Sequence, residues 1–229
     1  LYLMKCRLLH RIPVLIGIGI LATIFSGCKR KTYTVRTEVV KINSPRQIEP
    51  LSHALVKPLL YTNISGLEQL PVPEAKEKFI SAVLPAILVA KNEIETLSIQ
   101  ISVLKDDESW DETDSSFFNE AKDKYKAKDI DDLILRIGTL PNSIVLAQAA
   151  VESGWGQSRF FLEGNNLFGI WSYNANEPRM AAGKTRNGKT IFIRAYPDMS
   201  RSIIHYFEIL GSASAYRSLR KARLETTDP

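Results

Sequence analysis

The chain has 229 residues, of which 45% are hydrophobic and 24% charged, a composition typical of a folded protein rather than a disordered one. Its formal charge is +5, but Lys5, Arg7 and Arg11 precede the first acidic residue, so the remainder carries 5 − 3 = +2. This near balance excludes the strongly basic character of nucleic-acid-binding domains.

The first 28 residues have the pattern of an export signal. The three early cations precede an apolar run, Ile12 to Phe25, and Ser26-Gly27-Cys28 follow it. Basic, apolar and small-residue segments in this order are typical of a secretory signal, and an apolar run of about 14 residues is short for a membrane-spanning helix. We expect residues 1–27 to be a signal peptide; a plain N-terminal membrane anchor is the alternative.

The residues just before Cys28 resemble a bacterial lipobox, which implies that this cysteine is lipidated and anchors the chain to a membrane. Lys29 follows it, not the aspartate that resembles an inner-membrane retention signal. We therefore expect an exported lipoprotein of the outer membrane that faces the periplasm. The other cysteine, Cys6, lies inside the signal, so the mature body would have neither a free thiol nor a disulfide.

Two segments precede the residues that carry chemistry. Residues 28–73 are polar and interrupted by prolines, which is typical of a tether, with one short helix near Ala54 to Tyr61. Residues 74–128 form a helical extension. Apolar residues from Phe79 to Leu104 recur at helical spacing, and Pro85 is expected to kink or split that helix. A charged helix follows around Ser115 to Lys128.

Residues 129–229 form the main predicted domain. A short helix over Ile130–Ile137 is followed by one over Ile144–Ser153 that is apolar nearly all round, as in a core helix. Asn187-Gly188 predicts a β-hairpin. Asp198 or Ser200 then begins a last helix that Gly211 ends. The predicted fold is mainly α, with a small β-hairpin lobe and a helical N-terminal extension.

Glu152 is the one acid of the apolar helix and lies in its last turn. Burial and the negative end of the helix dipole both disfavour the charged carboxylate, so we expect its pKa to be raised. A carboxyl that stays protonated near neutral pH suits a general acid that protonates a glycosidic oxygen. The alternative is a structural glutamate bonded to the backbone of the glycine turn that follows.

Aromatic residues crowd the chain just beyond Glu152. Their flat faces suit sugar rings. Most of them are expected in the core, and we assign Trp155, Trp171 and Tyr173 to a possible groove wall.

Several consecutive motifs resemble the Bax-type glucosaminidase domain, which is related to the flagellar rod muramidase-like glycoside hydrolases. They are Leu146-Ala147-Gln148-Ala149-Ala150, Glu152-Ser153-Gly154-Trp155-Gly156, Glu163-Gly164-Asn165-Asn166-Leu167-Phe168-Gly169 and Arg194-Ala195-Tyr196. The resemblance covers roughly residues 74–229. It implies a lysozyme-like helical fold and an activity that cleaves glycan strands of the cell wall. It makes Glu152 the acid and Tyr196 an active-site residue that orients a water or stabilises an oxocarbenium-like state. It adds Asn166 and Phe168 to the candidate substrate-binding residues.

The chain departs from this family in two places. The hairpin residues 184–188 contain no acid, although family members that have a second carboxylate carry it in the hairpin lobe. Glu177 is our candidate for that carboxylate, and a mechanism that uses the substrate's own acetamido group is the alternative. The chain also ends at Pro229, where family members usually continue through another helix.

No metal, nucleotide or other cofactor is implied, because His53 and His205 stand alone in the sequence and no phosphate-binding loop is present. The predicted function is cleavage of β-1,4 bonds in peptidoglycan as an endo-β-N-acetylglucosaminidase. The predicted partners are peptidoglycan strands and, through the lipid, a membrane. A lytic transglycosylase, a muramoyl–alanine amidase and a non-catalytic peptidoglycan-binding lipoprotein are the alternatives.

Overall fold

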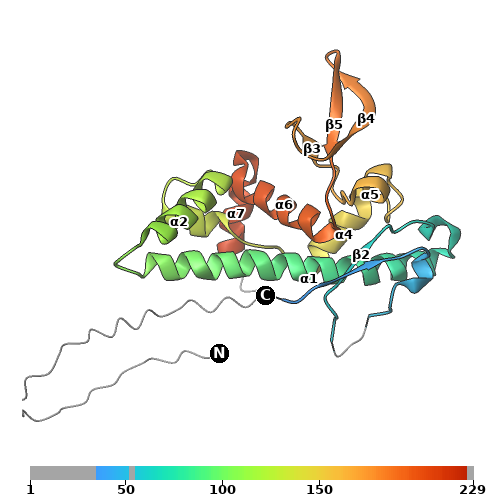
Figure 1. Ribbon diagram of the computed structural model, residues 1–229, viewed down its shortest axis with the longest axis horizontal. Coiled ribbons are helices and arrows are strands. Elements are labelled where there is room, and N and C mark those ends of the chain that lie inside the picture. Colours follow the sequence, from blue (N-terminus) through green and yellow to red (C-terminus); the bar gives the residue numbers. More distant parts are fainter. Residues whose placement is uncertain (1–34, 52–54, 226–229) are drawn as a thin grey trace, which may run out of the picture. The chain divides into compact units, whose positions relative to one another are not determined.

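The computed structural model is mainly helical and has one small antiparallel sheet, which confirms the predicted fold class (Figure 1). The chain divides into two compact units, residues 1–31 and 32–229. The structure describes residues 35–51 and 55–225, all in the second unit. The expected signal peptide, Cys28 and residues 226–229 lie outside the described residues. Within the described part, no helix combines the length and the apolar character needed to cross a bilayer.

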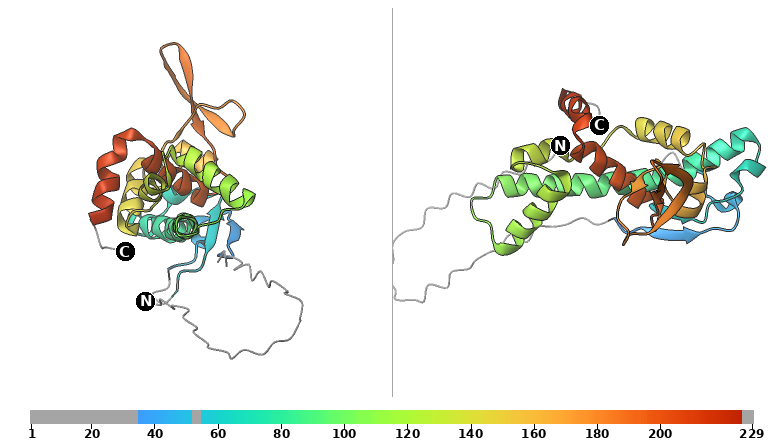
Figure 2. Two further views of the ribbon diagram at one scale, coloured as in Figure 1. Left: turned by 90° about the vertical axis from the view of Figure 1, so that its left-hand side faces the viewer. Right: turned by 90° about the horizontal axis from the view of Figure 1, so that it is seen from above.

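The longest element is α1 (Val72–Lys105), a helix of 34 residues. It contacts α3, α4, α6 and β2, and the left view of Figure 2 looks along it. Pro85 lies inside this helix and is buried, and the helix continues through it, so the expectation of a split is wrong. An internal proline removes one backbone hydrogen bond. Burial of the residues on both sides offsets that cost, because α1 packs along its length with residues that include Phe79, Val83, Ile87, Ile94, Ile101 and Leu104.

The segment before α1 is folded where the structure describes it, so the expectation of an extended tether is wrong there. Strands β1 (Glu38–Lys41) and β2 (Leu59–Thr62) pair in parallel, and the 3-10 turns η1 (Pro45–Gln47) and η2 (Leu67–Gln69) flank them. Ile42, Ile48 and Tyr61 of this segment are buried in the same apolar cluster as α1. The segment therefore contributes to the core.

Helices α2 (Glu112–Tyr125), α3 (Ile130–Arg136), α6 (Met199–Ser212) and α7 (Arg217–Glu225) complete the helical layer, with η3 (Ser214–Tyr216) before α7. Aspartates cap three of them, since the side chains of Asp111, Asp129 and Asp198 accept hydrogen bonds from the first-turn amides. Asp198 is one of the two residues predicted to begin α6, and α6 extends one residue beyond the expected end at Gly211.

Arginine side chains satisfy the carbonyls at the ends of these helices. Such carbonyls have no partner within their own helix. Arg220 is buried and donates to the carbonyls of Leu210 and Ala213 at 2.8 Å each. Arg136 bonds the ends of α2 and α6, and Arg223 bonds the end of α3. The helices around α6 are therefore joined through their C-termini.

Helices α4 (Asn142–Glu152) and α5 (Arg159–Gly164) lie next to the sheet-bearing segment. The prediction that α4 is buried on every side is wrong. Val145, Ala149 and Ala150 face the core, but Val151 is 77% exposed and Ile144, Ala147 and Gln148 are exposed as well. An open, partly apolar face therefore runs along α4 toward its C-terminus.

The antiparallel sheet has the strand order β3–β5–β4, formed by β3 (Trp171–Ser172), β4 (Arg179–Arg186) and β5 (Lys189–Arg194). The predicted hairpin turn is confirmed, since Asn187 and Gly188 take positive φ values of 51° and 73° between β4 and β5. Figures 1 and 2 both show the hairpin projecting away from the helices.

Candidate active site

Glu152 is the last residue of α4 and its side chain is exposed. No side chain in the described part of the chain forms an ion pair or hydrogen bond with its carboxylate. Both the expected burial and the alternative of a glutamate bonded to the glycine turn are therefore wrong. The structure instead presents a free carboxyl on the open face of α4, where a polymer can reach it.

The chain turns sharply away from Glu152 through three successive residues with positive φ, namely Gly154 (58°), Trp155 (57°) and Gly156 (79°). Buried Ser153 supports the turn: its hydroxyl donates to the carbonyl of Ala149 at 2.6 Å and accepts from the amide of Gly156 at 2.9 Å. A left-handed conformation is costly for tryptophan. The hydrogen bonds of Ser153 hold this turn directly after Glu152.

Trp155 packs onto the helical body. Its ring meets Phe79 of α1 edge-on, with a centroid distance of 5.6 Å, and the ammonium of Lys76 lies 4.8 Å from the ring centroid. The ring is half-buried against the core. Its contacts offset the strained backbone and connect the end of α4 to α1.

Asn166 is buried, and its amide is fully used within the chain. The nitrogen donates to the carbonyls of Ile170 and Arg194, and the oxygen accepts from the amides of Phe168 and Ile170. Asn166 thus fastens the hairpin lobe to the loop after α5, and its contact with substrate stays a prediction.

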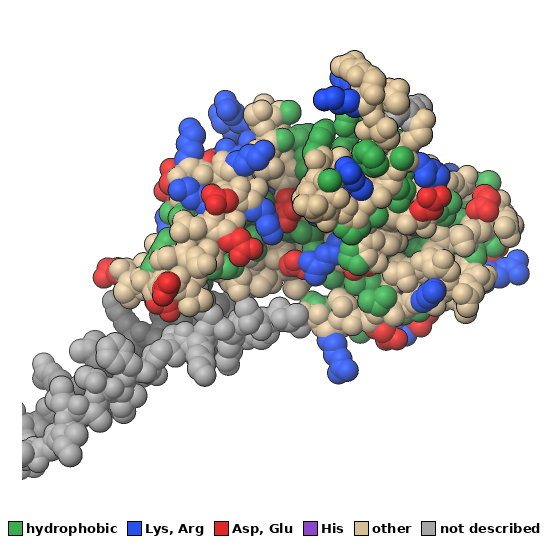
Figure 3. Space-filling model, turned by 45° about the horizontal axis from the view of Figure 1, so that its top comes forward, with side chains coloured by type: hydrophobic (Ala, Val, Ile, Leu, Met, Phe, Trp, Pro, Cys, Tyr) green, Lys and Arg blue, Asp and Glu red, His purple; other side chains and the backbone are tan. Residues whose placement is uncertain are grey.

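A hollow of about 790 Å³ lies at the base of the hairpin. Figure 3 shows hydrophobic side chains gathered in this region. Trp171 and Tyr173 line it with ring centroids 6.2 Å apart, and Tyr173 is 86% exposed. Of the three residues predicted as groove wall, the structure brings these two together at the hollow and places Trp155 on the body.

A polar network closes the inner side of the hollow. Glu177 pairs with Arg194 at 3.4 Å. The same Arg194 nitrogen lies 3.3 Å from Nδ1 of His205, and the hydroxyl of Tyr196 lies 2.7 Å from that Nδ1. Glu177, Arg194 and His205 line the hollow, whereas Tyr196 is only 8% exposed behind them. Glu177 is thus an ion-paired group rather than a solvated surface carboxylate.

The buried position of this network shifts its titration. Burial raises the pKa of the Tyr196 hydroxyl above its ordinary value, although the nearby Arg194 opposes that shift. Burial, assisted by the positive charge of Arg194, lowers the pKa of His205 to about 4. His205 is therefore neutral near pH 7, and Tyr196 keeps its proton.

The open face of α4 is connected to this network. The hydroxyl of Tyr206, next to His205 on α6, donates to Oε1 of Gln148, and the Tyr206 ring stacks on Phe168 at 4.3 Å. Gln148 lies one helical turn before Glu152, so both are on the same side of α4. Phe168 thus packs on the tyrosine that bonds α6 to α4, and Glu152 lies one turn farther along the same side of α4.

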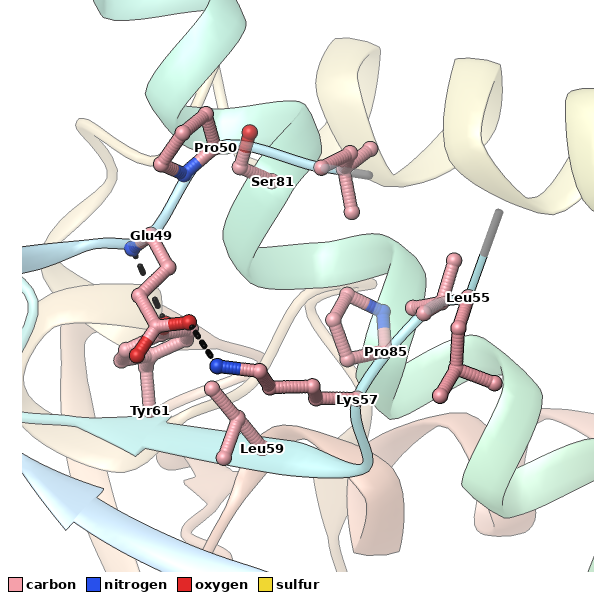
Figure 4. Close-up of a pocket in the computed structure, with 10 residues that line it drawn as sticks. Glu49, Pro50, Leu55, Lys57, Leu59, Tyr61, Ser81 and Pro85 are labelled. Carbon is pink, nitrogen blue, oxygen red and sulfur yellow. Dashed lines mark hydrogen bonds and ion pairs between the residues drawn. The ribbon is translucent and has the colours of Figure 1, made fainter. Parts of the chain in front are cut away.

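Another hollow, of about 240 Å³, lies between the β1–β2 segment and α1 (Figure 4). There Lys57 pairs with Glu49 at 2.6 Å, and the Tyr61 hydroxyl accepts from the Glu49 amide at 3.0 Å. None of the predicted site residues lines it. The candidate active site is therefore the hollow with its aromatic pair and polar network, together with Glu152 on α4, the helix that Gln148 and Tyr206 join to α6.

Arg194 and His205 are site residues that the sequence alone does not identify. His205 has no second histidine or cysteine near it in the chain. The sequence contains one indication of them. Arg194 comes directly after buried Ile193 at the end of β5, and His205 lies on α6 one turn after buried Ser202. Residues on a strand end and on the next helix can meet, although the spacing alone does not fix the pair.

Comparison with known proteins agrees with this site. Residues 127–229 match the family model of mannosyl-glycoprotein endo-beta-N-acetylglucosaminidase. This part of the chain is therefore similar to a glucosaminidase domain. The match contains Glu152, the aromatic pair and the polar network, whereas α1 and the β1–β2 segment precede it.

Part of the chain is also similar to a curated protein. Over 95 residues the chain is 33% identical to Protein bax of Escherichia coli (strain K12), a stretch that covers 41% of this chain and 32% of that protein. The chain thus spans about a third of the length of the curated relative it matches. No solved structure matches the chain significantly.

Proposed function

We propose that the chain cleaves β-1,4 glycosidic bonds of peptidoglycan as an endo-β-N-acetylglucosaminidase, with Glu152 as the general acid. The observation that carries the proposal is the free, exposed carboxyl of Glu152 inside the segment that matches the glucosaminidase family. It ends a helix that is hydrogen-bonded through Gln148 to Tyr206 of α6, the helix whose His205 lines the aromatic hollow.

In this proposal the glycan lies across the open face of α4 and the hollow. Trp171 and Tyr173 offer flat faces to sugar rings. Glu152 protonates the leaving oxygen. A bound glycan covers this carboxyl and excludes water from it.

Lytic transglycosylation is the second candidate, and the state of Glu177 favours it. Two-carboxylate glycosidases need a second acidic group free to act on water or on the sugar. Glu177 is instead paired with Arg194, so Glu152 is the carboxylate left free. The same observation suits a hydrolase in which the substrate's acetamido group takes the second role.

The test is digestion of purified peptidoglycan by the full chain, followed by mass spectrometry of the products. Three proteins are compared: the unchanged chain, Glu152→Gln, and the control Glu163→Gln, which alters an exposed acid on α5. We expect reducing N-acetylglucosamine ends from the first and third proteins and none from Glu152→Gln.

Each other result selects another function. Anhydromuramic ends identify a lytic transglycosylase, and released peptide stems identify an amidase. Retention on insoluble peptidoglycan without any product identifies a non-catalytic binder. Equal product from the unchanged chain and Glu152→Gln contradicts the role of Glu152.

We also propose that the chain works from a membrane in the periplasm, anchored by a lipid on Cys28. The support is the signal-like sequence and the lipobox-like residues before that cysteine. Cys28→Ala is expected to move the protein from the membrane fraction to the soluble fraction. Equal membrane retention of both proteins contradicts the anchor.

A further inference from the structure

Nδ1 of His205 is approached by two groups at once. Nη1 of Arg194 lies 3.3 Å from it and the hydroxyl of Tyr196 lies 2.7 Å from it. A guanidinium only donates hydrogen bonds and stays protonated in proteins. A ring nitrogen facing it must therefore be the unprotonated, accepting nitrogen.

This assignment determines the rest of the cluster. Because Nδ1 carries no hydrogen, the Tyr196 hydroxyl also donates to it. The single proton of the neutral imidazole then resides on Nε2. Tyr196 and Arg194 thus act as positioning residues that fix both the tautomer and the orientation of the ring.

The charges that face His205 come from several elements. Arg194 on β5 and Lys124 on α2 lower its pKa, and Glu177 before β4 opposes them. Glu208 of α6, one turn farther along, pairs with Lys124 at 3.4 Å. Burial contributes most, so the ring is neutral at the pH where the site would work.

The other edge of the ring is open. Nε2 has no hydrogen-bond partner in the described part of the chain. It is also absent from the buried polar atoms without a partner in that part, which are the Tyr125 hydroxyl and Oδ1 of Asn142. Nε2 is therefore accessible, on a residue that lines the hollow beside Trp171 and Tyr173.

We propose that His205 is a ligand-binding residue whose Nε2–H donates a hydrogen bond to the acetamido carbonyl of an N-acetylhexosamine held in the hollow. A neutral donor suits a neutral amide oxygen, which is a stronger acceptor than a sugar hydroxyl. The aromatic pair beside it offers faces for the ring that bears this group. The inference rests on the proposed function for its choice of ligand.

Two substitutions separate the ligand-facing nitrogen from the internal one. In His205→Asn, the amide oxygen can replace Nδ1 toward Tyr196 and Arg194, but nothing replaces Nε2–H. In His205→Gln, the amide nitrogen reaches the position of Nε2 and keeps a donor there. If His205 has a purely structural role, His205→Asn should keep more of the ligand affinity than His205→Gln. If His205 binds the ligand, His205→Gln should keep more of it.

The probe is tetra-N-acetylchitotetraose, titrated calorimetrically into the full chain carrying Glu152→Gln, so that turnover does not interfere. We expect His205→Asn to weaken binding about 3- to 10-fold, the usual effect of one hydrogen bond, and His205→Gln to retain most of the affinity. Undiminished binding by His205→Asn, equal weakening by both variants, or no binding by the parent protein overturns the proposal.

A second measurement does not depend on glycan. The ring ¹⁵N shifts of His205 at pH 7 should report a proton on Nε2 and a bare Nδ1; a proton on Nδ1, or on both nitrogens, overturns the proposal. Failure of peptidoglycan cleavage with His205-dependent binding intact refutes the proposed function alone. Cleavage that proceeds while His205→Asn binds normally refutes this inference alone.

Discussion

The hydroxyl of Tyr196 and Nδ1 of His205 lie 2.7 Å apart and join the residues after β5 to the middle of α6. This bond connects the hairpin lobe to the helical body on the inner side of the hollow. Because it requires an unprotonated Nδ1, its strength depends on pH.

We expect the free energy of unfolding to fall as the pH falls from about 6.5 toward 4. His205 has its pKa lowered to about 4 in the folded chain, whereas in the unfolded chain it is ordinary, near 6.5. In that window the unfolded state binds the proton and the folded state does not, so stability is lost on acidification. The half-buried position reduces the effect to about 1–2 kcal/mol.

The measurement is urea unfolding at several pH values in this window, with His205→Gln as the comparison. Glu208 contributes with the opposite sign, because burial raises its pKa and its protonation in the folded state stabilises the fold. The difference between the two proteins removes that contribution. A difference that does not change with pH contradicts the prediction.

Gly156 and Gly154 form a matched pair in the turn after Glu152. A Cβ on Gly156 would lie about 3.0 Å from Leu67 and Phe79, whereas a Cβ on Gly154 meets nothing within 4 Å. Both have positive φ, so alanine costs about 1 kcal/mol of backbone strain at either. We expect Gly156→Ala to lose a further 1–3 kcal/mol, roughly, from overpacking. The measurement is thermal unfolding of both variants. Equal midpoints would mean that Leu67 and Phe79 move aside at little cost, which contradicts the prediction.

Arg220→Met tests the links between helix ends. It leaves the carbonyls of Leu210 and Ala213 without their donor, and we expect a loss of about 2 kcal/mol in unfolding free energy. Lys221→Met, at the exposed neighbouring position, should change it by less than about 0.5 kcal/mol. If the two variants unfold at the same urea concentration, the buried guanidinium does not stabilise the fold.

Glu152→Gln is expected to separate activity from stability. Its carboxylate is exposed and has no ion pair in the described chain, so unfolding free energy should change by less than about 0.5 kcal/mol. Loss of a general acid should lower kcat about 10²- to 10⁴-fold. Parallel assays of peptidoglycan release and urea unfolding check both values. A destabilised variant would mean that lost activity reports lost structure.

Much of the fold could be predicted because its signals are local. Asn187-Gly188 takes the positive φ values that a tight hairpin needs, and Asp198 caps α6 where its sequence position suggests. The position of Glu152 at the end of α4 was likewise predictable from the glycine that follows. Each of these features depends on a few neighbouring residues.

The failed expectations concern which surfaces are covered. The apolar composition of α4 is the same whether other elements enclose the helix or leave Val151 exposed to solvent. Three of the four hydrogen bonds of the Asn166 amide are to Phe168 and Ile170 of its own loop, and the fourth, to the carbonyl of Arg194, depends on where the hairpin lies. The pairing of Arg194 with Glu177 and His205 depends on how the hairpin meets α6, which local patterns do not specify.

Helix α1 packs against the segment that matches the glucosaminidase family but lies outside that segment. The match begins at residue 127, yet the ring of Phe79 on α1 contacts that of Trp155, and α1 contacts α4 and α6. The matched segment therefore shares its apolar core with a helix that precedes it. If residues 127–225 were transferred into another protein, the apolar sides of α4 and α6 that α1 covers would be exposed, so the host would have to provide a helix to cover them.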